Sequence, residues 1–203
     1  MYPPKHHQEY DPVLIQKVAR QYPFATLVSA ENDIPFVTHL PLILKENKLV
    51  GHLDLNNPHT ELLKENKSVV AIFRGPQTYI SPSIYTSKQL PTWNYLISHA
   101  YGSVEEITDP KSIKQSMVDM TDNLEGSEGK FTLDIDDPRM DRLLPHIHCF
   151  EIHIQRWEGK FKISQDKSVN DIENAKQELI KNNQNNIADF INNIYTEHFH
   201  QSK

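Results

Sequence analysis

Short β-like segments separated by tight turns fill the first part of the chain, and this pattern limits the fold more than any other feature. Residues 24–29, 35–39 and 48–53 are rich in β-branched and apolar residues, and turn residues such as Glu31-Asn32-Asp33 and Glu46-Asn47 lie between them. A parallel crossover needs about a dozen residues or more, usually a helix. We therefore expect antiparallel pairing in this part of the chain.

Further strands are predicted along the rest of the chain. They are expected at residues 68–73, 79–80, 93–104, 147–157 and 160–163. Gly75-Pro76 is expected to end the first of these, and Glu158-Gly159 is expected to turn the chain between the last two.

Three Asp-Pro or Asn-Pro pairs mark predicted helix starts, because Asp or Asn caps a helix and proline fits its first position. These pairs are Asp11-Pro12, Asn57-Pro58 and Asp109-Pro110. Gly126 is expected to end the third helix, residues 138–144 predict a short helical turn, and residues 169–199 predict two helices broken near Asn182-Asn183. The order of elements predicts an α+β fold built on a small antiparallel barrel or sandwich.

Composition excludes several classes of protein. Cys149 is the single cysteine, so neither a disulfide within the chain nor a multi-cysteine metal site is possible. No stretch approaches the ~20 apolar residues of a membrane span, and the first residues lack the apolar core of a secretory signal, so we expect a soluble cytoplasmic protein. The net charge of −6 argues against a domain that grips nucleic acid directly.

Polar and aromatic side chains gather in segments that could form a ligand cleft. The predicted strand ending at His52 leads to Asn56-Asn57 at a helix start, where unpaired backbone N–H groups favour phosphate. Flat surfaces come from Tyr85, Trp93 and Tyr95, neutral hydrogen-bonding groups from Asn94, Ser164 and Gln165, and charges from Lys88, Lys162 and Lys167. A planar, phosphorylated heterocycle would suit such a cleft.

Each of these features also has a purely structural interpretation. Asn57-Pro58 is also what a plain helix start looks like, Trp93 suits an apolar core, and strand histidines such as His39 and His52 often bond locally. His146, His148 and His153 do not share one strand face with a carboxylate at ligand spacing, so we expect no metal site. No nucleophile, phosphate-loop or dinucleotide motif is present, and we assign no catalytic residue.

At these segments the sequence resembles the PaiB family, the FMN-binding split-barrel negative transcriptional regulators of bacteria. The matching stretches are, in order, Met1-Tyr2-Pro3, 23–28, 39–42, 51–53, 57–59, Gly75-Pro76, 79–83, 91–95 and Ser164-Gln165. The resemblance implies a six-stranded antiparallel split β-barrel with flanking helices over residues 1–167. A C-terminal helical extension over residues 168–203 would pack on the same domain.

The resemblance also implies a homodimer that holds FMN at the subunit interface. The implied cofactor-binding residues are His39, His52, Asn56, Asn57, Tyr85, Lys88, Trp93, Asn94, Lys162 and Gln165. Leu55 stands where the family carries an arginine, and Asp166 where it carries an asparagine. An arginine–phosphate bond contributes about 1.5–3 kcal/mol, so FMN binding is expected to be weaker than in a typical member, or lost.

Two functions follow from the resemblance. The first is a negative transcriptional regulator that contacts DNA only weakly or indirectly. The alternative is a flavin-dependent oxidoreductase, such as a flavin reductase or a pyridoxamine-phosphate-oxidase-like enzyme, acting on a small molecule. His39, His52, Tyr79 and Tyr85 would then be the proton donors. Whether the protein is an enzyme stays open on the sequence.

Overall fold

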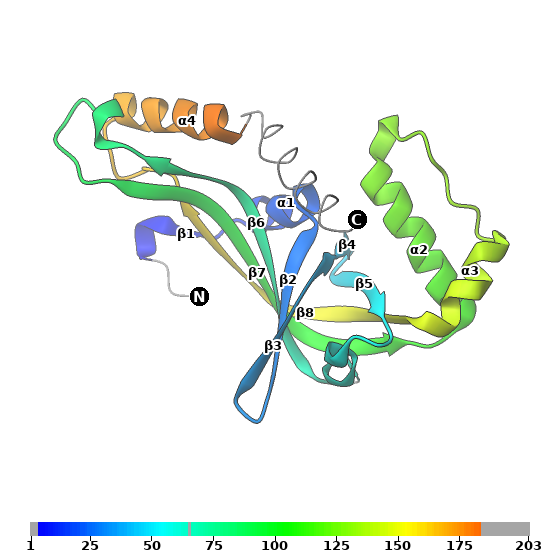
Figure 1. Cartoon of the computed structure of the whole chain (residues 1–203). Helices are drawn as coiled ribbons and strands as arrows, with labels where there is room; N and C mark the ends of the chain where they lie inside the picture. The colour runs from blue at the N-terminus through cyan, green and yellow to red at the C-terminus, as the bar shows by residue number, and fades with distance from the viewer. Residues whose placement is uncertain (1–3, 65, 184–203) are drawn as a thin grey trace, which may run out of the picture. The chain divides into compact units, whose positions relative to one another are not determined.

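The computed structural model describes residues 4–64 and 66–183, and one eight-stranded sheet dominates it (Figure 1). The strands are β1 (Gln8–Glu9), β2 (Phe24–Glu31), β3 (Ile34–Pro41), β4 (Ile43–Lys45), β5 (Lys48–Asp54), β6 (Ser68–Ile80), β7 (Thr92–Ile107) and β8 (Ile147–Lys162). They follow the order β3-β2-β6-β7-β8-β5-β4, and β1 pairs with β8. Without the two-residue β1 and the three-residue β4, six longer strands remain, as the resemblance implies.

The described residues also contain four α-helices and five short 3-10 turns. The α-helices are α1 (Pro12–Gln21), α2 (Pro110–Glu125), α3 (Pro138–Leu143) and α4 (Val169–Asn183). The short 3-10 turns are η1 (Lys5–His7), η2 (Pro58–Leu62), η3 (Pro82–Ile84), η4 (Gly126–Glu128) and η5 (Leu144–His146). No helix among the described residues is long and apolar enough to cross a bilayer. The second helix predicted beyond Asn183 lies outside the described residues.

The chain forms two compact units. The first contains residues 1–75 and 96–161, and the second contains residues 76–95 together with residue 162 onward. α4 therefore belongs with the connection between β6 and β7 in the second unit. The sequence predicted a domain boundary after residue 167, which differs from this division into two units. That domain boundary stays a prediction.

Two hairpins in the first unit confirm the predicted antiparallel pairing. β2 pairs with β3 from Phe24↔Pro41 to Glu31↔Ile34, and the connecting Asn32 and Asp33 both have positive φ, 51° and 65°. Positive φ at both central residues is the signature of a two-residue turn that matches strand twist. β4 and β5 form the second hairpin around the predicted turn at Glu46.

Alternate residues of the strands fill an apolar core in the first unit. Leu27, Phe73 and Phe150 are fully buried in it, and α1 adds Val18 and Ala19. Successive side chains of a strand point to opposite faces, so the neighbours of these residues lie on the outer face. On the same helix Ile15 is also buried, whereas Val13 and Leu14 are exposed.

Two predicted breaks are absent from the strands. β6 continues through Gly75-Pro76 to Ile80. Its pairing with β2 ends at Ile72, so Pro76 removes no backbone hydrogen bond on the β2 side of the strand. β8 continues through Gly159 to Lys162. A Cβ at Gly159 would lie 2.6 Å from Cγ1 of Ile15, so this glycine permits close packing of α1 instead of turning the chain.

The helix ends follow the predicted capping signals. The carboxylate of Asp109 accepts the Ser112 N–H at 2.8 Å at the start of α2, and Gly126 with φ 65° ends that helix. Asp11 caps α1 in the same way. At Asn57 the predicted helix is a single five-residue 3-10 turn, η2.

Candidate functional site

A buried polar cluster centred on Ser164 lies in the second unit. The Ser164 hydroxyl is 2.8 Å from the Tyr85 hydroxyl, and it accepts a hydrogen bond from the Asn94 side-chain amide at 3.0 Å. Asn94 is 1% exposed and Ser164 is 4% exposed. The structure thus brings together two predicted site residues, Tyr85 and Asn94, around Ser164, which the sequence predicted as a neutral hydrogen-bonding group of the same cleft.

Ser164 also has an unusual backbone conformation. Its φ is 64°, in the left-handed region that residues other than glycine seldom adopt. Its carbonyl accepts the Lys167 N–H at 3.0 Å, and the Gln165 side chain accepts the Ile163 N–H at 2.9 Å. Such a conformation persists where its surroundings hold it, and residues of this kind are frequent at ligand sites.

Trp93 lies on the other side of the same strand. Asn94 is buried, whereas Trp93 is 49% exposed and meets the 48% exposed Tyr79 edge to face, with 6.3 Å between ring centroids. Thr92 shares the face of Asn94 by strand alternation, and its hydroxyl accepts a hydrogen bond from the Lys162 ammonium. One chain therefore presents Trp93 and Asn94 to opposite faces of β7.

The remaining predicted residue of the second unit is Lys88. It is exposed in the loop that follows η3, three residues after Tyr85. An exposed ammonium in this loop is available to an anionic ligand.

The first unit carries four predicted site residues, two of them histidines on outward faces of strands. His39 on β3 is exposed, bonds the Thr26 hydroxyl at 3.0 Å and stacks on Phe24. His52 on β5 is half-buried. Its Nδ1 is buried and has no hydrogen-bond partner among the described residues. Burial lowers the pKa of His52, so its ring is neutral at pH 7.

Asn56 and Asn57 bond locally in the first unit. The Asn57 side chain accepts the His59 N–H at 3.0 Å, which caps the turn η2, and the amide of Asn56 donates to Asp54. These bonds match the plain turn-start interpretation weighed above. A ligand-binding role for the two asparagines stays a prediction.

His59 is a buried histidine of the first unit that no site prediction included. Its Nδ1 lies 2.8 Å from the Thr38 hydroxyl and its Nε2 lies 2.9 Å from the Ser29 hydroxyl. Burial lowers its pKa. Both ring nitrogens are satisfied within the protein, so His59 ties η2 to β2 and β3. The only local signal was its place in the motif Asn57-Pro58-His59.

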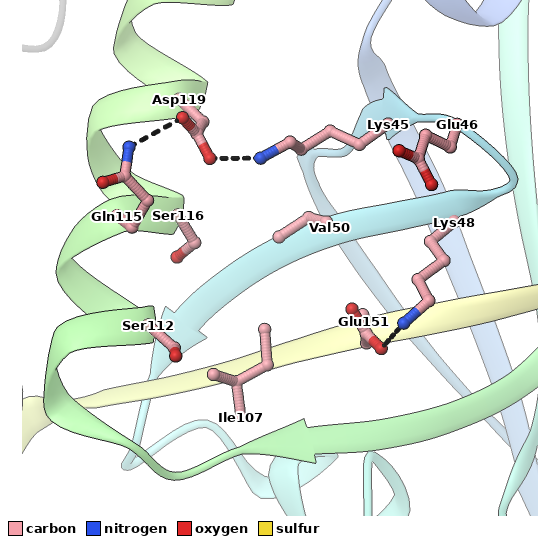
Figure 2. Close-up of a pocket in the computed structure, with 10 residues that line it drawn as sticks. All are labelled: Lys45, Glu46, Lys48, Val50, Ile107, Ser112, Gln115, Ser116, Asp119 and Glu151. Atoms are coloured by element: carbon pink, nitrogen blue, oxygen red, sulfur yellow. Dashed lines mark hydrogen bonds and ion pairs between the residues drawn. The ribbon is translucent and has the colours of Figure 1, made fainter.

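A pocket of about 360 Å³ lies between the β4–β5 hairpin and α2 in the first unit (Figure 2). Figure 2 shows Lys45 reaching Asp119, and Lys48 reaching Glu151, as ion pairs at its walls. None of the predicted site residues lines it. Because both lysines already have carboxylate partners, an anionic ligand would have to displace them.

Glu105, Glu151 and His153 converge on the surface of the first unit. The His153 Nε2 is 2.6 Å from Glu105 and 3.1 Å from Glu151, a spacing that could hold a metal ion. The sequence did not predict this, because Glu105 comes from β7, far from β8 along the chain. The ammonium of Lys48 also binds Glu151, so ion pairing accounts for the group without a metal.

The donor set of the second unit suits a flavin. The half-buried Tyr85, held by the buried Ser164 and Asn94, can offer its hydroxyl to the polar edge of the ring or its phosphate, and Lys162 and Lys88 add positive charge. The half-exposed rings of Trp93 and Tyr79 offer flat apolar surface. Leu55 stands where the resemblance implied an arginine, so the chain offers no guanidinium at this position.

Comparison with solved structures shows which fold the chain adopts. The fold resembles the FAD and heme binding protein from Mycobacterium smegmatis, with a TM-score of 0.64 and 15% identity over 82% of this chain and 79% of that chain. It also resembles the flavocytochrome Anf3 from Azotobacter vinelandii, with a TM-score of 0.62 and 15% identity over 79% and 72%. The expected fold is confirmed as an α+β split β-barrel of the kind found in flavin-binding proteins.

Sequence comparison then gives the family. The family model described as "Putative FMN-binding domain" matches residues 1–156. The protein named "Protease synthase and sporulation protein PAI 2" from Bacillus subtilis (strain 168) is 26% identical over 184 residues, which cover 88% of this chain and 89% of that protein. This chain belongs to the FMN-binding PaiB family, as the motifs predicted.

Proposed function

We propose that this protein is an FMN-binding, homodimeric negative regulator of transcription. Family membership supports the flavin, and the printed name of the Bacillus subtilis relative links that protein to protease synthesis and sporulation. The observation that carries the proposal is the buried Tyr85–Ser164–Asn94 cluster, which supplies hydrogen-bonding groups beside a family-matched motif. When bound, FMN supplies a redox-active ring, and the protein binds and orients it.

Separate groups of residues would hold the ring and the phosphate of FMN. Tyr85, Ser164 and Asn94 offer neutral hydrogen bonds, and Lys88 and Lys162 offer charge for a phosphate. Gln165 and Trp93 complete the contribution of the second unit. The predicted contributions of the first unit, from His39, His52, Asn56 and Asn57, are part of the same proposal. The unpartnered Nδ1 of His52 is the strongest support among them.

In a homodimer, residues on opposite faces of β7 can both contribute to flavin binding. A two-fold interface builds each site from both copies, so Trp93 of one copy and the Tyr85 hydroxyl of the other, held by Ser164 and Asn94, would belong to the same site. The outer face of the β2–β3 hairpin supports self-association, since Phe24 is 66% exposed and Val37 is 54% exposed.

FMN titration tests the flavin directly. Binding should quench flavin fluorescence with one site per chain, and Asn94→Ala should weaken it because Ser164 loses its amide partner. Gln115→Ala, on the exposed face of α2, is the matched control and should bind as the wild type does. Absence of quenching at micromolar FMN overturns the proposal.

We propose that regulation reaches DNA through a partner or a metabolite instead of by a tight direct grip. The net charge of −6 disfavours direct backbone binding. A gel shift that survives moderate salt would contradict this part. A cytoplasmic location stays a prediction.

A flavin-dependent oxidoreductase is the second candidate. The observation in its favour is the exposed phenol of Tyr79 beside the ring of Trp93, a proton donor next to a flat surface. NADH or NADPH oxidation by the FMN-loaded protein should then be measurable and should fall in Tyr79→Phe. No oxidation with either nucleotide argues for the regulator.

A further inference from the structure

Asp171 is a buried carboxylate in the first turn of α4. Its side chain is 1% exposed. It accepts the Thr86 backbone N–H at 2.6 Å, the Thr86 hydroxyl at 2.9 Å and the Ser87 hydroxyl at 3.1 Å. These hydrogen bonds, first of all that from the Thr86 backbone, hold the pKa of Asp171 below its ordinary value. The group is therefore ionised at neutral pH.

A second side chain of α4 holds the same loop. The Asn174 amide donates to the Ile84 carbonyl at 2.8 Å. Residues three apart share one helix face, so α4 holds the loop at two points, on either side of Tyr85. Figure 1 shows α4 running along this connection between β6 and β7. Between these points, Tyr85 reaches the Ser164 hydroxyl.

We propose that Asp171 is the positioning residue of the flavin site. This inference rests on the proposed function. An ionised carboxylate away from water is costly unless hydrogen bonds satisfy it, and here the loop supplies three of them. Moving the loop would leave the charge unsatisfied. Asp171 therefore keeps the loop around Tyr85 in one arrangement before the ligand arrives.

Preorganisation of this kind changes apparent affinity. A ligand binds more weakly in proportion to the fraction of protein in the competent conformation. If loss of the carboxylate lowers that fraction to about one tenth, the FMN dissociation constant rises about tenfold. The helix α4, whose role the sequence did not reveal, thereby becomes part of the site.

Three variants test the inference in the full-length protein. Asp171→Ala removes the acceptor, Asp171→Asn keeps its shape without the charge, and Glu173→Gln changes an exposed acid two residues along the same helix. FMN fluorescence quenching gives the dissociation constant and the number of sites. Amide hydrogen exchange of residues 81–90 reports the loop without ligand. We expect Asp171→Ala to bind FMN about tenfold more weakly than the wild type, with an unchanged number of sites and faster amide exchange in the loop. Asp171→Asn should give an intermediate dissociation constant. Glu173→Gln should match the wild type in both measurements.

The outcomes separate the inference from the proposed function. A purely structural role would lower the melting temperature and the number of sites but leave the dissociation constant of the folded protein unchanged. That result overturns the positioning role, as does unchanged exchange in Asp171→Ala. If Asp171→Ala does not fold, Asp171→Asn with wild-type affinity overturns it. If the wild type itself binds no FMN, the flavin proposal falls and this inference with it.

Discussion

At the residue scale, Leu55 has the clearest consequence for FMN binding, because the resemblance implied an arginine at this position. It is 50% exposed, and its backbone N–H already donates to the His146 carbonyl, so an arginine fits there without disturbing the fold. Leu55→Arg should tighten FMN binding by about tenfold or more, because a hydrogen bond to a charged group contributes about 1.5–3 kcal/mol. FMN titration measures this. Val13→Arg adds the same charge at another exposed site, and an equal gain there would contradict a specific phosphate contact.

Single residues of the site also have features that the sequence alone did not predict. Trp93 and Asn94 were predicted to line one cleft because polar and aromatic side chains are dense in their segment. Strand alternation separates them to opposite faces. The role of Ser164 depends on a positive φ and on Tyr85, a partner 79 residues away in the sequence, and neither leaves a local trace. The motif order identified the family, while side-chain direction needed the structure.

At the scale of elements, Gly159 illustrates the limit of turn signals. Sequence assigned it to a turn, but it lies within β8 against α1, where a Cβ would meet Ile15. Gly159→Ala should destabilise the protein by about 1–3 kcal/mol through overpacking, measured by urea unfolding. Ile15→Ala removes the nearest atom in conflict and leaves only the Glu9 Cβ, at 2.9 Å, so the double variant should cost less than the sum of the two single changes. Strict additivity would show that contact with Ile15 is not the reason for the glycine.

Other elements were predictable because their signals are local. Asp109 and Asn32-Asp33 act within a few residues, so the start of α2 and the β2–β3 turn are where the sequence placed them. Pro76 was misinterpreted as a strand end because its effect depends on whether β2 still pairs beside it, a tertiary fact.

At the scale of the whole molecule, the proposed interface couples flavin binding to dimerisation. A ligand that binds only the dimer stabilises it by mass action, by about 2.7 kcal/mol at a hundred times its dissociation constant. Val37→Asp places a charge on the exposed face of β3, so it should weaken self-association and FMN binding together. Sedimentation velocity with and without FMN, paired with fluorescence titration at the same protein concentrations, measures both. Val13→Asp, on α1, should leave both unchanged. A monomeric Val37→Asp protein that binds FMN as tightly as the wild type would show that each chain carries a complete site, and the interface would then have no part in holding the flavin.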